Sequence, residues 1–301
     1  MIYHKPVLLK ESVDGLNIKP KGIYVDLTFG GGGHSREILA RLGKNGRLLA
    51  FDQDKDAREN IPEDPRITFI HANFRFLKNF LRYYGIEKLD GIIADLGISS
   101  HQIDEKNRGF TFRQNASLDM RMNRGSDLTA EKILNEYPGS DLLRIFRVYG
   151  ELRGAHRFVL RIEQGREKKR IKDSHALIEI LGNLVKGPQS NKTLARLYQA
   201  LRIEVNDEMI ALEEMLKQVP DVLKDEGRLV VLSYQSIEDR MVKNLIKTGN
   251  IEGELEKDFF GKQKLLFKAV NRNIITASEE EIKENPRSRS AKLRIAERIY
   301  E

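Results

Sequence analysis

A run of four glycines, Gly30–Gly33, is the feature that most limits how this chain can fold. The run follows the strand-like apolar segment YVDLTF, residues 24–29, and precedes a helical pattern. Glycine lacks a Cβ atom, so it can adopt positive φ and bring backbone N–H groups against a ligand, at an entropic cost. We therefore predict a strand, a ligand-binding loop and a helix. A glycine-rich turn without a ligand is the alternative.

The spacing of the glycines discriminates between nucleotide-binding motifs. A dinucleotide fingerprint would need a third glycine where the chain has Ser35 or Arg36, and no Gly-Lys-Ser/Thr follows to form a phosphate loop. The next strand-like segment, RLLAFDQD, ends near Asp52, whose carboxylate suits the two hydroxyls of a ribose. A nucleoside without a phosphate tail, such as S-adenosylmethionine, fits both features. An incidental surface aspartate is the alternative for Asp52.

Hydrophobic patterning predicts an α/β fold with a doubly wound, mostly parallel sheet. Helices over Ser35–Leu42 and Phe76–Tyr84 are suited to connect the first strands. The predicted strands are Gly22–Leu27, Arg47–Phe51, Ile67–His71, Asp90–Leu96 and Arg228–Tyr234, with a terminal hairpin of Lys264–Val270 and Lys292–Arg298.

Strand patterns stop between Asp104 and Val205, where only helical patterns occur. The predicted helices are Thr129–Tyr137, Asp141–Val148, Glu151–Gln164, Ser174–Val185 and Thr193–Arg202, and an amphipathic helix over Asp207–Leu223 leads back to the sheet. We therefore divide the chain into a sheet domain, residues 1–103 and 207–301, and an inserted helical domain, residues 104–206.

The composition excludes several kinds of chemistry. The 301 residues contain no cysteine, which excludes disulfides, cysteine-ligated metals and a thiolate nucleophile. We expect no metal cofactor. No apolar run approaches the ~18 residues of a membrane helix, and the N-terminal segment is unlike a signal peptide, so we expect a cytoplasmic protein.

The net charge of +7 is unevenly distributed along the chain. Residues 153–172 contain eight Lys or Arg against two Glu, and a second basic segment occupies residues 285–299. Such patches are typical of surfaces that bind a polyanion, because each neutralised phosphate releases counterions. A solvated helix face is the alternative for either segment.

The segment LDGIIADLGISSHQID, residues 89–104, contains the second candidate site. Asp95 falls at the carboxyl end of a predicted strand, the edge of an open α/β sheet where ligands bind, and Ser99 follows it. Methyl transfer to an amine requires alignment of the acceptor, and a carboxylate or hydroxyl that accepts its N–H would direct the lone pair toward the methyl group. Asp95 and Ser99 are the candidates for this role. A turn cap followed by loop serines is the alternative.

Ten segments of the chain together resemble one family over nearly the whole length. They are HKPVLLKE (4–11), VDLTFGGGGHS (25–35), FDQD (51–54), HANF (71–74), DLGISSHQID (95–104), RGFTF (108–112), LDMRM (118–122), QALRIEVNDE (199–208), SYQSIEDR (233–240) and NPRSRSAKLRIAER (285–298). The chain resembles the bacterial ribosomal RNA small subunit methyltransferase H family, also called MraW. Members of that family use S-adenosylmethionine to methylate the exocyclic amine of a cytidine in small-subunit ribosomal RNA.

The resemblance implies a Rossmann-like class I methyltransferase sheet whose inserted helical domain recognises the substrate. It also implies S-adenosylmethionine as cofactor and small-subunit ribosomal RNA, in the assembled subunit, as partner. His34 is expected to cap the glycine loop rather than act as a base. The cofactor contacts that the resemblance implies by position are Gly32, Gly33, His34, Asp52, Phe74, Asp95 and Gln102.

Cytosine can be methylated on a ring carbon or on its amine. Attack on the ring carbon requires a cysteine, which this chain lacks, so methylation of the amine is the remaining chemistry. The target base must leave its stack to reach the cofactor, so a pocket for it is expected. Phe110 and Phe112 are candidates to line this pocket, and packing in a helical core is the alternative for both. Two other functions stay open: an RNA-binding assembly factor with a vestigial cofactor site, and a methyltransferase that acts on a protein or a small molecule.

Overall fold

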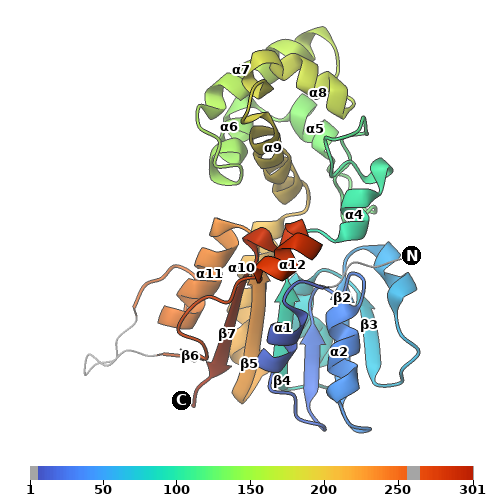
Figure 1. Ribbon diagram of the computed structural model, residues 1–301, viewed down its shortest axis with the longest axis vertical. Helices are drawn as coiled ribbons and strands as arrows, with labels where there is room; N and C mark the ends of the chain where they lie inside the picture. The colour runs from blue at the N-terminus through green and yellow to red at the C-terminus, as the bar shows by residue number, and fades with distance from the viewer. Residues whose placement is uncertain (1–5, 256–264, 301) are drawn as a thin grey trace. The chain divides into compact units, whose positions relative to one another are not determined.

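The computed structural model describes residues 6–255 and 265–300 (Figure 1). The chain divides into two compact units, one of Met1–Gly97 with Met209–Glu301 and one of Ile98–Glu208. The first unit contains the sheet and the second is helical. Among the helices of the described chain, none combines the length and the apolar character that a membrane span requires.

The first unit is built on one seven-stranded sheet with the order β3–β2–β1–β4–β5–β7–β6. The strands are β1 (Ile23–Asp26), β2 (Arg47–Asp52), β3 (Ile67–His71), β4 (Leu89–Asp95), β5 (Leu223–Ser233), β6 (Phe267–Ala269) and β7 (Lys292–Arg298). The first five in the sheet run parallel, and β7 is antiparallel to both β5 and β6. The predicted sheet is confirmed. Lys264, where the terminal hairpin was expected to begin, lies outside the described residues.

Helices cover both faces of this sheet. They are α1 (Leu9–Gly15), α2 (Gly33–Arg41), α3 (Leu77–Tyr83), α10 (Glu208–Val222), α11 (Ser236–Thr248) and α12 (Glu279–Glu284). Neighbouring side chains of a strand point to opposite faces, so each central strand contributes to two cores. Val25 and Ile92 join the cluster that contains residues of α3, α10 and α11, whereas Tyr24 and Ile93 join the cluster with α1 and α2. All four side chains are fully buried.

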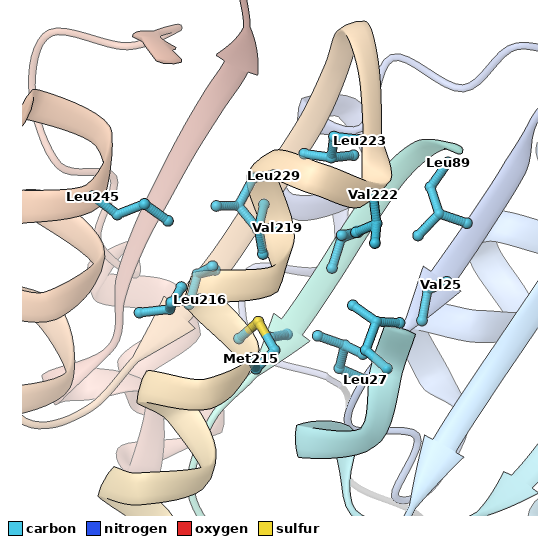
Figure 2. Packing of buried hydrophobic residues seen from close by; sticks show 14 of the residues in the cluster. Val25, Leu27, Leu89, Met215, Leu216, Val219, Val222, Leu223, Leu229 and Leu245 are labelled. Carbon is cyan, nitrogen blue, oxygen red and sulfur yellow. The ribbon is translucent and has the colours of Figure 1, made fainter. Parts of the chain in front are cut away.

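Helix α10 shows how one face is closed (Figure 2). Its residues Met215, Leu216 and Val219 recur at helical spacing and are fully buried. They pack in one cluster with Leu229 of β5 and Leu245 of α11. Burial of each such side chain contributes about 1.5–3 kcal/mol, so this packing anchors β5 beside β4 in the sheet.

The second unit is an α-helical insertion with its own core. Its helices are α4 (Ser100–Asp104), α5 (Ala130–Glu136), α6 (Gly139–Val148), α7 (Ala155–Lys168), α8 (Ser174–Leu181) and α9 (Ser190–Val205). Phe146 of α6, Ile162 of α7 and Leu197 of α9 are fully buried in one cluster. Within the described residues of this unit no strand forms, and one isolated bridge links Ser117 with Asp173. The predicted helical character of the insertion is confirmed, and its expected bounds, residues 104–206, stay a prediction beside the compact unit Ile98–Glu208.

Some element boundaries differ from the predictions. The helix expected over Glu151–Gln164 begins later, at Ala155. Glu151 and Gly154 have φ of 47° and 66°, in the left-handed region, so the chain turns twice before the helix starts. Helices α1, α4, α11 and α12 were not among the expected elements.

Candidate active site

The central strands β1 and β4 bring the glycine loop and Asp95 to the same edge of the sheet. Strand β1 pairs with β2 on one side and with β4 on the other, so the chain order reverses between β1 and β4. Parallel strands end at a common edge, and an open α/β sheet binds its ligands where the order reverses. The strand order therefore places both predicted motifs around one location.

The glycine loop between β1 and α2 depends on its glycines for backbone conformation and packing. Gly30 and Gly32 have φ of 51° and 74°, values that residues other than glycine seldom adopt. A Cβ on Gly32 would lie 2.7 Å from the ring of Phe29, and a Cβ on Gly33 would overlap Cγ of Pro6. Both glycines are thus required for the loop itself, in addition to any contact they make with a ligand.

Asp26, the last residue of β1, is hydrogen-bonded to residues on both sides of the glycine run. It is 2% exposed and accepts hydrogen bonds from the Ser35 hydroxyl at 2.7 Å and from the Thr28 N–H at 3.1 Å. Burial raises the pKa of Asp26, and these two hydrogen bonds oppose that rise. Sequence reasoning gave this acid no role, although the order of strand, acid and glycines was its signal.

Asp52 lies at the end of β2, beside the glycine loop. Its Oδ2 accepts the N–H of Gly30 and its Oδ1 accepts the N–H of Asp54, both at 2.8 Å. Burial raises the pKa of Asp52 to about 7 against the effect of these hydrogen bonds. Each carboxylate oxygen has a second lone pair, so Asp52 can also accept ribose hydroxyls.

Phe74 follows β3 at the start of a short 3-10 turn, Phe74–Phe76. The turn is capped by Asn73, whose side chain accepts the N–H of Arg75 at 3.0 Å. The ring of Phe74 is half-buried and packs against the core cluster around α3 and α10. One part of the ring therefore belongs to the core and the rest is accessible.

His34 faces Asp95 beside the glycine loop, with 4.0 Å between His34 Nδ1 and Asp95 Oδ2. His34 is 6% exposed, and burial lowers its pKa, so the ring is neutral at neutral pH. Its Nε2 is buried and has no hydrogen-bond partner among the described residues. Helix α2 begins after Gly32, which has no side chain that could cap it, and the expected capping role of His34 in the glycine loop stays a prediction.

Asp95 is held by its backbone and by one carboxylate oxygen. Its N–H donates to the Thr28 hydroxyl at 2.7 Å, and Oδ1 accepts the hydroxyl of Tyr234 at 2.8 Å. Burial raises the pKa of Asp95 to about 7, and the Tyr234 hydrogen bond opposes this rise. Oδ2 accepts no hydrogen bond from any described residue. Sequence reasoning missed Tyr234, although its place directly after β5 put it at the same sheet edge.

Ser99 and Gln102 belong to the second unit, where they form the capping box of α4. The Ser99 hydroxyl accepts the N–H of Gln102 at 3.2 Å, and Gln102 Oε1 accepts the N–H of Ser99 at 3.1 Å. Gln102 is 5% exposed. These hydrogen bonds give both side chains a structural role, and their contacts with substrate and cofactor stay predictions.

The RGFTF and LDMRM segments meet in the core of the second unit. Arg108 is 2% exposed, and its guanidinium donates to the carbonyl of Arg121 at 3.0 Å and lies 5.8 Å from the ring centre of Phe110. Phe110 is itself buried in this core. Phe112 is half-buried and packs edge-to-face on Tyr198, with ring centres 5.3 Å apart. Core packing, the alternative given for Phe110, describes its position, and a place for either ring in a base pocket stays a prediction.

The basic segment 153–172 contains two kinds of arginine. Arg166 donates to two backbone carbonyls and Arg170 pairs with two glutamates, so both hold the fold together. Arg153, Arg157 and Arg161 are exposed and form no ion pair with any described residue. We call these three side chains the arginine face.

Most basic side chains of the segment 285–299 form ion pairs or hydrogen bonds with other parts of the chain. Lys292 and Arg294 both pair with Asp239, at 3.6 Å and 2.7 Å, and Arg298 donates to the carbonyls of Leu266 and Ile299. These charges are therefore already neutralised or hydrogen-bonded, and the arginine face of the second unit is the stronger candidate for a polyanion.

Comparison with known proteins agrees with the motifs. The model of the MraW methylase family matches residues 1–299. The chain is 55% identical over 298 residues to the ribosomal RNA small subunit methyltransferase H of Bacteroides thetaiotaomicron, covering 99% of this chain and 98% of the relative. The protein of the same name from Phocaeicola vulgatus is also 55% identical, over 297 residues and with the same two coverages. The chain therefore belongs to the MraW methylase family.

Proposed function

We propose that this protein transfers the methyl group of S-adenosylmethionine to the exocyclic amine of a cytidine in 16S ribosomal RNA. The observation that carries the proposal is the placement of Asp95, with an open Oδ2, at the sheet edge beside the glycine loop. Relatives at 55% identity over nearly their whole length are named ribosomal RNA small subunit methyltransferase H, which supports this substrate.

The residues at this edge fit S-adenosylmethionine. Asp52 has lone pairs for the ribose hydroxyls, and His34 offers a buried Nε2 that has no partner in the described chain. The carboxyl groups of Asp26 and Asp95 favour a positive charge nearby. The described residues contain no cluster of three or more His, Asp or Glu side chains that could hold a metal ion. When bound, the cofactor supplies a methyl group on a positively charged sulfur.

Asp95 is the residue that orients the target amine. Its Oδ2 accepts one N–H, which turns the nitrogen lone pair toward the methyl carbon. A bound cofactor would supply the methyl group to this lone pair and would keep the electron pair of its carbon–sulfur bond, so the transfer would balance. The methylated amine then loses a proton, and a carboxylate with a pKa of about 7 is suited to receive it. No strong base is needed, in keeping with a neutral His34.

The second unit is the part of the enzyme that we assign to substrate recognition. Arg153, Arg157 and Arg161 carry exposed charges without an acidic partner among the described residues. Guanidinium groups bind phosphate oxygens with two parallel hydrogen bonds, so such a face suits the RNA backbone. We further propose that the substrate is the assembled small subunit and that the enzyme works in the cytoplasm.

Methyl transfer from labelled S-adenosylmethionine to small ribosomal subunits that lack their native cytidine methylation tests the proposal. We expect the label to appear as amine-methylated cytidine on nucleoside analysis. The variant Asp95→Ala should abolish transfer and keep RNA binding; retained turnover would remove Asp95 from the mechanism. Cofactor binding without labelled RNA would refute the substrate, and loss of both would leave an RNA-binding assembly factor as the better description.

A further inference from the structure

The hydrogen bond from Tyr234 to Asp95 joins the ends of two neighbouring strands. Asp95 is the last residue of β4, and Tyr234 directly follows β5, the strand that pairs with β4. The Tyr234 hydroxyl lies 2.8 Å from Asp95 Oδ1. Strand pairing therefore fixes the distance between the two residues, and the hydroxyl selects one of the two carboxylate oxygens.

Tyr234 is itself held in place from the other side. Its backbone N–H donates to Oε2 of Glu238 at 2.9 Å, and the same oxygen accepts the N–H of Gln235 at 3.1 Å. Glu238 lies in the first turn of α11 and is 1% exposed. A buried carboxylate thus sets the backbone of Tyr234, and Tyr234 sets the carboxylate of Asp95.

We propose that Tyr234 is a positioning residue for methyl transfer, whose hydroxyl holds Oδ1 of Asp95 so that Oδ2 faces the target amine as an ionised acceptor. The inference rests on the proposed function of Asp95. Without the hydroxyl, the Asp95 side chain is free to rotate and its charged form loses a donor. Tyr234 does not touch the reacting atoms, so its effect passes through Asp95.

The charged groups around this pair define its response to pH. Asp95 faces the neutral ring of His34 from α2 and the carboxyl group of Asp26 from β1. Tyr234 faces the carboxylates of Glu238 from α11 and Glu281 from α12. Burial and the acids Asp95, Glu238 and Glu281 raise the pKa of Tyr234, so its hydroxyl keeps its proton and stays a donor. Asp95 is therefore the group that titrates in the working range.

The variant Tyr234→Phe removes the hydroxyl and keeps the ring. We expect kcat for methyl transfer at pH 7 to fall about tenfold, with the KM for cofactor changed less than threefold. Losing a donor to a carboxylate raises its pKa, so the acidic limb of the kcat profile should move up by about one pH unit. Tyr83→Phe, at a tyrosine that is 79% exposed, is the matched control and should leave both values unchanged.

A titration that does not need turnover separates this inference from the proposed function. In protein labelled with ¹³C at the aspartate carboxyl carbons, the Asp95 signal is assigned by its loss in Asp95→Asn. Its midpoint should rise in Tyr234→Phe and stay unchanged in Tyr83→Phe. An unshifted midpoint, or an unshifted limb with wild-type kcat, would overturn the role of Tyr234. A shifted midpoint in a protein that methylates no RNA would support the positioning and refute the proposed function alone.

Discussion

The arginine face gives the sharpest quantitative prediction for RNA binding. Arg153, Arg157 and Arg161 each present one exposed charge with no acidic partner in the described chain. A protein that neutralises phosphates loses affinity with salt, with a slope of log K against log salt of about 0.7 per contact on single strands and about 0.9 on duplexes. If each arginine contacts one phosphate, changing all three to Gln should reduce the slope by about 2 to 3.

This difference in slope translates into a measurable loss of affinity. Between 50 and 200 mM salt the wild type should weaken roughly 16- to 60-fold more than the triple variant Arg153→Gln, Arg157→Gln and Arg161→Gln. Fluorescence anisotropy with a labelled fragment of small-subunit ribosomal RNA at four salt concentrations gives both slopes. Because the three side chains are exposed, the thermal midpoint of unfolding should change little.

A charge-matched variant controls for the change in net charge. Lys21, Lys44 and Arg47 are exposed and lie at or just before the starts of β1 and β2, at the sheet edge opposite the glycine loop. Their replacement by Gln removes the same three charges and should leave the slope almost unchanged. An equal loss of slope in both triple variants would mean that only net charge attracts RNA, and an unchanged slope in the arginine variant would refute the arginine face.

Three further predictions concern the proposed cofactor site and the core of the second unit. Burial raises the pKa of Asp52 to about 7 and ribose hydroxyls favour its charged form, so the affinity of the wild type for the cofactor should rise with pH through 7. Calorimetry at pH 6 and pH 8 should show a weaker pH dependence of this affinity in Asp52→Asn. An equal dependence in both proteins would exclude Asp52 from the ribose site. Gly33→Ala forces a Cβ against Pro6, so we expect a loss of about 1–3 kcal/mol in the free energy of unfolding by urea together with weaker cofactor binding; wild-type values would contradict the packing described for the loop. Arg108→Met removes this donor from the buried Met122 carbonyl and the partly buried Arg121 carbonyl, so the second unit should lose about 2–3 kcal/mol, seen as earlier hydrogen exchange across α5 to α9. Unchanged exchange would show that Arg108 does not anchor that core.

Local sequence signals predicted the elements and the motifs better than the contacts between them. The apolar runs of β1, β2 and β3, and the helical spacing of α10, follow from burial on a sheet face or along a helix stripe, which a chain shows directly. The late start of α7 could not be read in this way. It depends on positive φ at Glu151 and Gly154, and a non-glycine residue adopts that conformation only because its surroundings hold it there.

For the charged residues, too, the sequence predicted the local pattern better than the contacts that each side chain makes. Eight basic residues between 153 and 172 predicted one continuous patch, yet Arg166 and Arg170 are engaged with carbonyls and glutamates from α5 and the loop that follows it. Which arginines have partners depends on residues about 30 to 40 positions away, so composition cannot distinguish them. Phe110 is similar, because its burial follows from the packing of the whole second unit.

The sequence by itself determined the glycine loop, the acid at Asp52, the strand end at Asp95 and the absence of a cysteine nucleophile, because each depends on residue type and short-range spacing. Only the tertiary structure decided that Tyr234 holds Asp95 and that the Asp26 carboxyl group closes the loop. The cap of α4 by Ser99 is local, because its hydrogen bonds with Gln102 span only three residues. The order of the strands brings residues more than a hundred positions apart into hydrogen-bond contact, and that order is set by packing on both faces of the sheet, which no local pattern contains.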